Sequence, residues 1–339
     1  MKFRFIYLNE IHHLLYFNIS FFLLAAKRDN YEIIDFLTKQ VNSIEKRCFY
    51  RCKKLTQIDI SSSVTTIESE AFSQCSSLAH VTIPSSVTSI GDNAFYGCSS
   101  LTQIQISSSV TSIGDYAFGG CSLLSQIQIP SSVKKIGKAA FLFCYSLTRI
   151  SIPSSVTSIG EDAFNHCLLL KQVSIPTSVT SIGKKAFALC SSLTQISIPS
   201  SLTLIKEETF EKCTSLEQIF IPSSVKKIER NAFISCVKLK QISLPPSLTS
   251  IEEKTFCGCS SLVQIKIPSS ITKIGKNAFY LCKSLSQIAI PSSVTEIGEG
   301  AFNMCSSLKQ IVIPSSVKAI ENGTFYDCLS LIQISIPSS

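Results

Sequence analysis

Thirteen cysteines stand 23 residues apart, without one insertion, from Cys52 to Cys328. Each has a Phe three residues before it, an Ile eight residues before it and a Leu three residues after it. A unit of 23 residues cannot enclose a core by itself, whereas stacked units share one. The repeat therefore predicts a solenoid of thirteen coils over residues 41–339, numbered 1 to 13 below. A non-repetitive chain of 339 residues would instead suggest about two compact domains.

The unit reads Val-Thr-Ser-Ile-Gly-x-x-Ala-Phe-x-x-Cys-Ser-Ser-Leu-Thr-Gln-Ile-x-Ile-Pro-Ser-Ser. The alternation in Gln-Ile-x-Ile predicts a short strand with its Ile side chains inward, so the stacked coils form one main parallel sheet. The β-branched Val-Thr-Ser-Ile predicts a second short extended segment on the opposite side. The spacing of Ala-Phe-x-x-Cys predicts a short helix or a 3₁₀ turn. We expect inward core columns that include Phe95, Phe118, Phe141, Cys98, Cys121 and Cys144.

At this level of detail the unit resembles the BspA-like leucine-rich repeats found on surface proteins of anaerobic bacteria and protists. The resemblance rests on Leu-x-x-Ile-x-Ile followed by Pro-Ser-Ser-Val-x-x-Ile-Gly-x-x-Ala-Phe-x-x-Cys, and it covers residues 41–339. It implies a right-handed leucine-rich-repeat coil that binds other macromolecules, often in adhesion. It also implies no enzymatic activity, and it gives no functional residues to carry over.

Fifteen cysteines could indicate a disulfide framework. Thirteen of them share one inward column, however, where the side chains point parallel to one another rather than toward one another. We therefore expect a column of small buried thiols that act as hydrophobic residues. Metal binding is not favoured, because Cys257-Gly258-Cys259 is too closely spaced for a ligand pair and only four His accompany the thiols.

No combination of residues typical of a catalytic site occurs, since His12, His13, His80 and His166 are scattered over the repeat. The abundant Ser is typical of the turns after Pro and Cys. We therefore predict no enzymatic activity and no cofactor. A net charge of +8 over 339 residues is also modest for a nucleic-acid-binding protein, so no nucleic acid is expected as a partner.

Residues 1–40 do not fit the repeat. Leu14 to Ala26 is an apolar run of thirteen residues, which is short of the about 20 needed to span a bilayer. We expect a helical N-terminal cap over coil 1, with helices near 10–26 and 30–39. Residues 24–37 resemble part of an ankyrin repeat, and a signal peptide ending near Ala25-Ala26 is the alternative interpretation.

The exposed face of the predicted main sheet carries Gln five residues after the column Cys in eleven of thirteen coils. Stacked amides can hydrogen-bond along a sheet. We therefore predict a structural ladder that includes Gln195, Gln218, Gln241 and Gln264.

Among near-identical coils, binding specificity has to come from positions that depart from the repeating unit. Between coils 4 and 10 the predicted strand face departs from it at six places, which form the candidate ligand-binding set: Arg149, Lys171, Glu217, Phe220, Lys240 and Lys266. By strand parity Phe220 points outward, and an exposed aromatic residue flanked by charges is typical of an interface anchor.

Two functions follow from these features. One is a surface-displayed solenoid that binds a protein or another macromolecule of a host surface, and the other is an intracellular scaffold. The resemblance favours the cell surface over the cytoplasm. No integral membrane span is expected. The apolar edge of coil 13, which includes Val317, Ile320, Phe325 and Leu331, is expected to allow self-association if nothing covers it.

Overall fold

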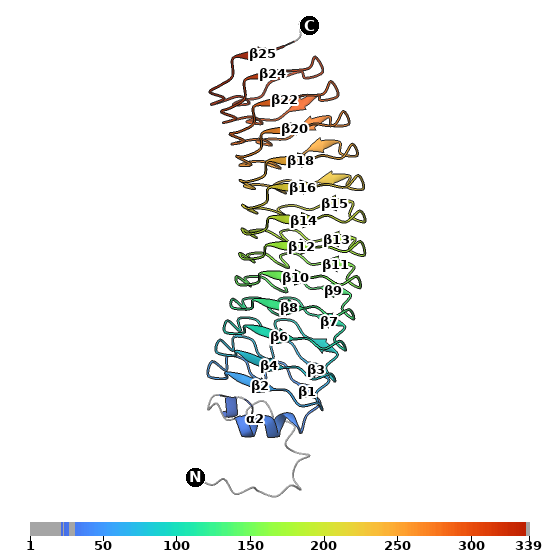
Figure 1. Ribbon diagram of the computed structural model, residues 1–339, viewed down its shortest axis with the longest axis vertical. Helices are drawn as coiled ribbons and strands as arrows, with labels where there is room; N and C mark the ends of the chain where they lie inside the picture. The colour runs from blue at the N-terminus through green and yellow to red at the C-terminus, as the bar shows by residue number, and fades with distance from the viewer. Residues whose placement is uncertain (1–21, 23, 27–30, 337–339) are drawn as a thin grey trace, which may run out of the picture.

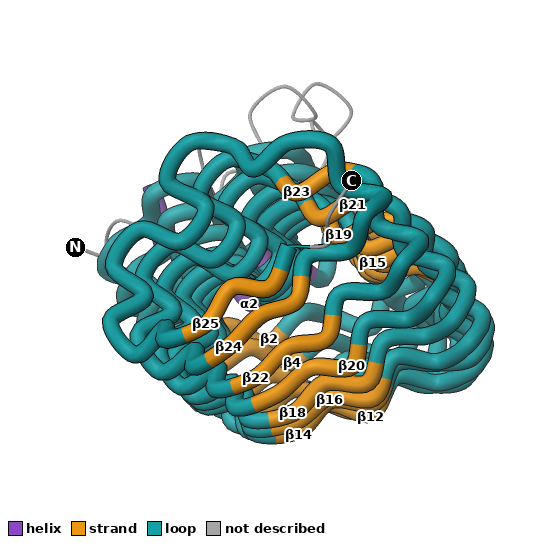
Figure 2. The backbone as a smooth tube through the Cα atoms, turned by 90° about the horizontal axis from the view of Figure 1, so that it is seen from above, coloured by secondary structure: helices purple, strands orange, loops and turns teal. Residues whose placement is uncertain are grey.

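The computed structural model describes residues 22, 24–26 and 31–336, and these form one elongated solenoid (Figure 1). Each coil has a three-residue strand on one side and, in coils 1 to 12, a two-residue strand on another side (Figure 2). All pairing between coils is parallel, with each residue opposite the residue 23 positions later, as for Ile150 and Val173. The prediction of a leucine-rich-repeat solenoid is confirmed.

The main sheet is formed by the three-residue strands. They are β2 (Gln57–Asp59), β4 (His80–Thr82), β6 (Gln103–Gln105), β8 (Gln126–Gln128), β10 (Arg149–Ser151), β12 (Gln172–Ser174), β14 (Gln195–Ser197), β16 (Gln218–Phe220), β18 (Gln241–Ser243), β20 (Gln264–Lys266), β22 (Gln287–Ala289), β24 (Gln310–Val312) and β25 (Gln333–Ser335). Backbone pairing runs from β2 to β14 and again from β16 to β25.

The second sheet is formed by the two-residue strands. They are β1 (Ser43–Ile44), β3 (Thr66–Ile67), β5 (Ser89–Ile90), β7 (Ser112–Ile113), β9 (Lys135–Ile136), β11 (Ser158–Ile159), β13 (Ser181–Ile182), β15 (Leu204–Ile205), β17 (Lys227–Ile228), β19 (Ser250–Ile251), β21 (Lys273–Ile274) and β23 (Glu296–Ile297). This sheet is interrupted before β15 and before β19.

Both interruptions of the second sheet fall at coils in which Thr replaces the Ala of the repeating unit. Thr209 in coil 8 and Thr255 in coil 10 are buried, and each donates its hydroxyl to the carbonyl of the residue three positions earlier, at 2.8 Å. Thr324 makes the same kind of bond in coil 13, which has no second-sheet strand among its described residues. The interruptions of the second sheet thus coincide with a buried Thr that bonds within its own turn.

The segment before each column Cys, for which a short helix or a 3₁₀ turn was predicted, is a run of turns and not a continuous helix. The turns are closed by hydrogen bonds between residues three apart, as from the Asn165 N–H to Asp162 O at 3.0 Å. In every coil the residues five and one positions before the Cys have positive φ, for example Asp162 (54°) and His166 (60°). Residues in this left-handed conformation end a helix. Alternate N–H groups turn toward the next coil instead, so the Phe141 N–H donates to Ala163 O at 2.8 Å. The segment thus adds inter-coil bonds that a helix would keep within itself.

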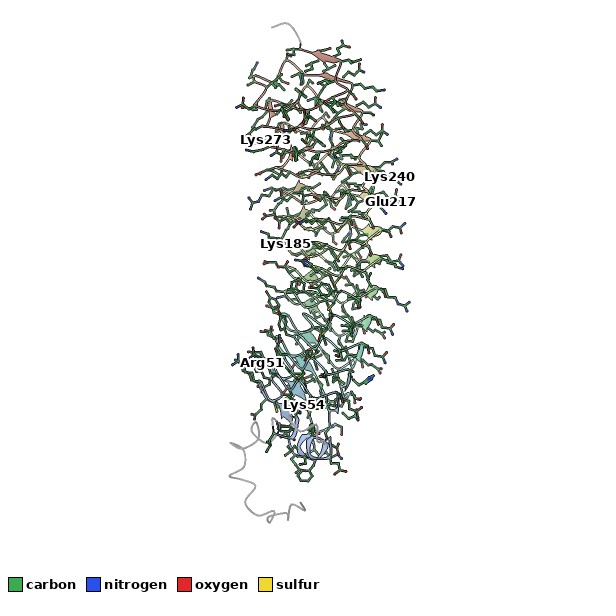
Figure 3. All side chains as sticks on the ribbon, turned by 90° about the vertical axis from the view of Figure 1, so that its left-hand side faces the viewer. Arg51, Lys54, Lys185, Glu217, Lys240 and Lys273 are labelled. Atoms are coloured by element: carbon green, nitrogen blue, oxygen red, sulfur yellow. The ribbon has the colours of Figure 1, made fainter. Side chains whose placement is uncertain are left out.

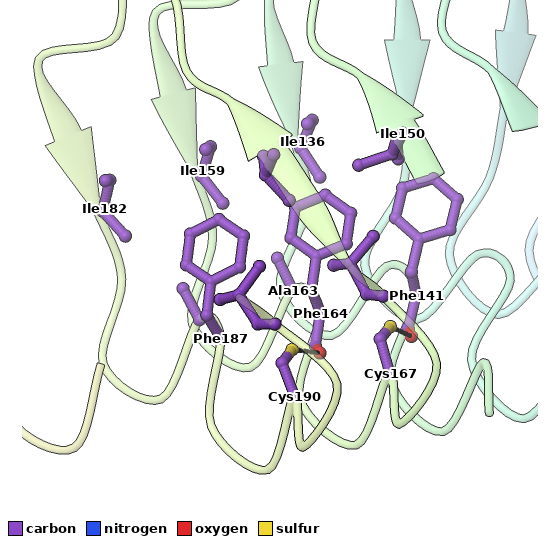
Figure 4. Close-up of a cluster of buried hydrophobic side chains, with 14 of the residues drawn as sticks. Ile136, Phe141, Ile150, Ile159, Ala163, Phe164, Cys167, Ile182, Phe187 and Cys190 are labelled. Atoms are coloured by element: carbon purple, nitrogen blue, oxygen red, sulfur yellow. Dashed lines mark hydrogen bonds between the residues drawn. The ribbon is translucent and has the colours of Figure 1, made fainter. Parts of the chain in front are cut away.

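The core consists of parallel columns, each formed by the equivalent residue of successive coils (Figure 4). From Phe49 to Phe325, successive Phe rings lie nearly parallel with centroids 4.9 to 5.9 Å apart. The column thiols all lack disulfides, and each one from Cys75 onward donates to the Phe carbonyl of the preceding coil, as Cys190 does to Phe164 O at 3.2 Å. The buried thiols are therefore hydrogen-bond donors as well as hydrophobic residues. Fully buried members include Phe95, Phe118, Phe141, Cys98, Cys121 and Cys144.

Helical residues lie against coil 1 at the N-terminal end. α2 (Tyr31–Thr38) buries Ile34, and the ring of Phe22 meets Phe49 edge-on at a centroid distance of 5.2 Å. Most of the expected first helix and of the alternative signal peptide lies outside the described residues. No described helix is long and apolar enough to cross a membrane.

In coil 13, core positions that are covered elsewhere become accessible. Ile320 and Ile334 are 43% and 42% exposed, whereas the equivalent Ile297 and Ile311 of coil 12 are 1% and 2% exposed. This is the surface for which self-association is predicted.

Charged residues alternate along the turn edge of coils 5 to 12, six positions before the column Cys. The column consists of Lys138, Glu161, Lys184, Glu207, Arg230, Glu253, Lys276 and Glu299. Glu207 pairs with Lys184 at 3.0 Å and with Arg230 at 2.9 Å, in the coils before and after its own. The observed register places opposite charges next to each other in successive coils, which favours it.

Candidate functional site

A long open groove of about 1660 Å³ follows the outer face of the main sheet from β10 to β25, in coils 5 to 13. Its lining consists mostly of the outward-facing first and third residues of these strands. The middle residue of each strand from β2 to β24 is buried. A repeated three-residue pattern therefore places about two side chains per coil in the groove.

Phe220 is the most exposed aromatic side chain on this face. It ends β16, lies opposite Ser243 of the next coil, and is 70% exposed. Ser occupies the same position in the coils before and after, so the ring has no neighbour of similar size along the column. An exposed ring in a hollowed surface is a typical anchor for a partner.

The six residues of the candidate set divide into three groups. Arg149, Phe220 and Lys266 line the groove. Glu217 and Lys240 line a smaller hollow of about 220 Å³. Lys171 lines neither, and its backbone carbonyl accepts from Thr194 of the next coil at 2.9 Å. The structure thus brings five of the six to two hollows on one face.

Glu217 and Lys240 form an ion pair across coils 8 and 9, with Oε2 and Nζ 2.9 Å apart (Figure 3). Lys240 holds the pKa of the Glu217 carboxyl below its usual value, chiefly through this hydrogen bond. Both side chains are more than half exposed, so solvent screens the pair and its contribution to stability is small. The pair neutralises the one acid on this part of the sheet face.

The Gln column lies in register along the groove. Gln172 is opposite Gln195, Gln218 is opposite Gln241, and Gln264 is opposite Gln287. Among the described residues, however, no side-chain hydrogen bond joins one of these amides to the next. The amides are exposed and available to a partner, and their contribution as a structural ladder stays a prediction.

Several residues on the groove face were missed from the sequence. Val263 and Val312 are 49% and 60% exposed there, and Lys238, Lys283 and Lys309 add positive charge at or beside the strands. Lys309 and Val312 belong to coil 12, beyond the coils from which the candidate set was drawn. Lys238 and Lys283 lie two residues and one residue after the column Cys, outside the three strand columns of that set. Val263 lies within those columns and coils, and its replacement of the usual Thr was the signal for it.

The remaining titratable side chains do not converge. His166 is half-buried, its pKa is lowered by burial, and its Nδ1 lies 2.9 Å from Asn165 Oδ1. The described residues contain no group of three or more His, Cys, Asp or Glu that could hold a metal ion. The groove is thus a contact surface with amide, cationic and apolar side chains.

Comparisons with known proteins agree with this architecture. The family model described as "BspA type Leucine rich repeat region (6 copies)" matches residues 27–141, 111–240 and 226–339. No curated protein matches the chain. A leucine-rich repeat protein of Bacteroides ovatus is 33% identical with a TM-score of 0.75, over 87% of this chain and 82% of that one. A leucine-rich cell surface protein of Faecalibacterium prausnitzii is 32% identical with a TM-score of 0.56, over 88% and 84%. The chain belongs to the BspA-type leucine-rich repeat family.

Proposed function

We propose that this protein is a non-enzymatic recognition solenoid of the cell surface that binds a protein or another surface macromolecule through the main-sheet groove. The observation that carries the proposal is the exposed Phe220 ring within an extended groove. The similar Faecalibacterium protein, which is named a cell surface protein, supports the location. Leucine-rich repeat proteins in general use such extended surfaces for binding.

Adhesion of intact cells tests the groove. Cells displaying Phe220→Ala should bind a target cell layer about 5- to 30-fold more weakly than cells displaying the parent, which corresponds to the ~1–2 kcal/mol of an aromatic anchor. The matched control is Leu123→Ala, since Leu123 is 51% exposed in coil 4 but lies outside the groove. Equal adhesion by parent and Phe220→Ala would contradict the groove as the binding site.

Protease treatment of intact cells tests the location. Blotting should show that the protein is cleaved while a cytoplasmic marker stays intact. A protein protected from protease until the cells are lysed would instead support the intracellular scaffold.

A further inference from the structure

Positive charge is concentrated on the face that contains the groove. The seven residues after each column Cys form the strand and the turn leading into it. In coils 5 to 13 these positions contain seven cations and one acid, a net charge of 7 − 1 = +6, out of +8 for the whole chain. In coils 1 to 4 they contain Lys53, Lys54 and Asp59, a net charge of 2 − 1 = +1. The positive charge and the groove therefore occupy the same coils.

Most of these cations have no counter-ion. The acid is Glu217, and it pairs with Lys240. The other six cations make no ion pair among the described residues: Arg149, Lys171, Lys238, Lys266, Lys283 and Lys309. On the turn edge, by contrast, cations such as Lys184 and Lys276 are paired with acids of the next coil. The groove face thus has an uncompensated positive potential that an anionic partner would neutralise.

Apolar side chains lie between the cations. Phe220 and Val312 line the groove together with Arg149 and Lys266. Val263, the residue directly before β20, is also exposed. A purely polyanionic ligand would leave these apolar side chains without a contact. A polypeptide with both acidic and apolar side chains would satisfy both kinds of residue and could also bond to the exposed Gln amides.

We propose that the groove binds an extended, acidic and apolar polypeptide segment that lies along the solenoid axis. Its carboxylates meet Arg149 and Lys266 in the groove and Lys309 directly before β24, and its apolar side chains cover Phe220 and Val312. Arg149 and Lys309 are seven coils apart, or ~34 Å at the spacing of parallel strands, which an extended segment of about ten residues spans. This inference rests on the proposed function, because it names the partner chemistry of the same groove.

Synthetic twelve-residue peptides test the charge requirement. One peptide contains four Glu and four large apolar residues, and its partner contains Lys in place of each Glu. Fluorescence anisotropy in 50 mM salt should show saturable binding of the Glu peptide and at least tenfold weaker binding of the Lys peptide. Equal binding of the two, or no binding of either up to 1 mM, would overturn the proposal.

Charge reversal places the peptide in the groove. Arg149→Glu, Lys266→Glu and Lys309→Glu combined should weaken binding of the Glu peptide at least tenfold. The control combines Lys53→Glu, Lys54→Glu and Lys318→Glu, which changes the net charge equally outside the groove and should leave binding within twofold. All six side chains are exposed, so both variants should keep the circular dichroism of the parent. Equal losses in the two variants would overturn the proposal in favour of non-specific attraction.

Phe220→Ala distinguishes a polypeptide from a polyanion. This substitution should weaken binding of the Glu peptide at least fivefold, while the binding of heparin and of a single-stranded oligonucleotide should stay unchanged. Unchanged peptide binding, together with full competition by heparin or the oligonucleotide, would overturn the proposal. Failure of the proposed function looks different, because adhesion would then be insensitive to the groove variants whether or not the acidic peptide binds.

Discussion

Coils 1 to 4 and coils 5 to 13 share one core but present different outer faces. The Phe, Cys, Leu and Ile columns continue from one region into the other with nearly the same burial. The groove, the excess of cations and the exposed Phe220 all belong to coils 5 to 13. The alternating charges of the turn edge are also confined to coils 5 to 12, since coils 1 to 4 have Lys46, Ser69, Asp92 and Asp115 there. The core thus fixes the architecture, while departures on the surface make the two regions different.

The largest expected effect is a loss of stability at high pH, and it tests whether the two regions share one core. Burial raises the pKa of Cys190 and Cys236 to about 12, and it also raises the pKa of the Cys98 and Cys121 thiols. An unfolded thiol ionises near pH 8.5, so stability should be full below that pH and fall above it. The loss is about 1.4 kcal/mol per thiol and pH unit, summed over many thiols.

Urea unfolding followed by circular dichroism from pH 7 to pH 10 measures this loss. Iodoacetamide labelling with peptide mass spectrometry locates it, and Cys98 and Cys121 should react as slowly at pH 8 as Cys190 and Cys236. Rapid labelling confined to one region would show that the cores differ.

A medium effect tests the charge alternation of the second region. Glu207→Lys places three cations in a row with Lys184 and Arg230 and removes two ion pairs. We expect the free energy of unfolding to fall by about 1–2 kcal/mol at low salt. Urea unfolding should show the loss shrinking in 0.5 M salt, because these side chains are partly exposed. The control Glu207→Gln should lose less, and a loss that does not change with salt would point to a cause other than charge.

The smallest effect concerns the Gln column, which runs through both regions. Gln241→Ala with Gln264→Ala in the groove, and Gln103→Ala with Gln126→Ala outside it, should each lower stability by about 0.5–1 kcal/mol if the amides form a ladder in solution. Thermal melts of the two variants measure this. Unchanged melting temperatures of both variants would contradict a structural ladder. A lower melting temperature in only one variant would show that the amides contribute to stability in only one of the two regions.

Much of the fold could be predicted from the sequence, because every coil repeats the same inward residues. The period of 23 residues assigns the strands, the buried Phe and Cys columns, and the neighbours of each side chain, such as Glu217 beside Lys240. The outward direction of Phe220 follows from strand alternation alone. The same alternation predicts that Arg149, Phe220 and Lys266 lie on one face of the sheet, where all three line the groove.

Other features depend on how the coils stack. Phe143 and Leu189 adopt positive φ without any Gly signal, because the N–H groups of these residues bond to the next coil. The hollowing of the sheet face from coil 5 onward also depends on the stacking of many coils. The sequence alone determined the repeat, the core and the strand faces, since these depend on residues within one unit and its neighbours. Only the tertiary structure decided the turn conformation and the groove, since these depend on contacts accumulated along the solenoid.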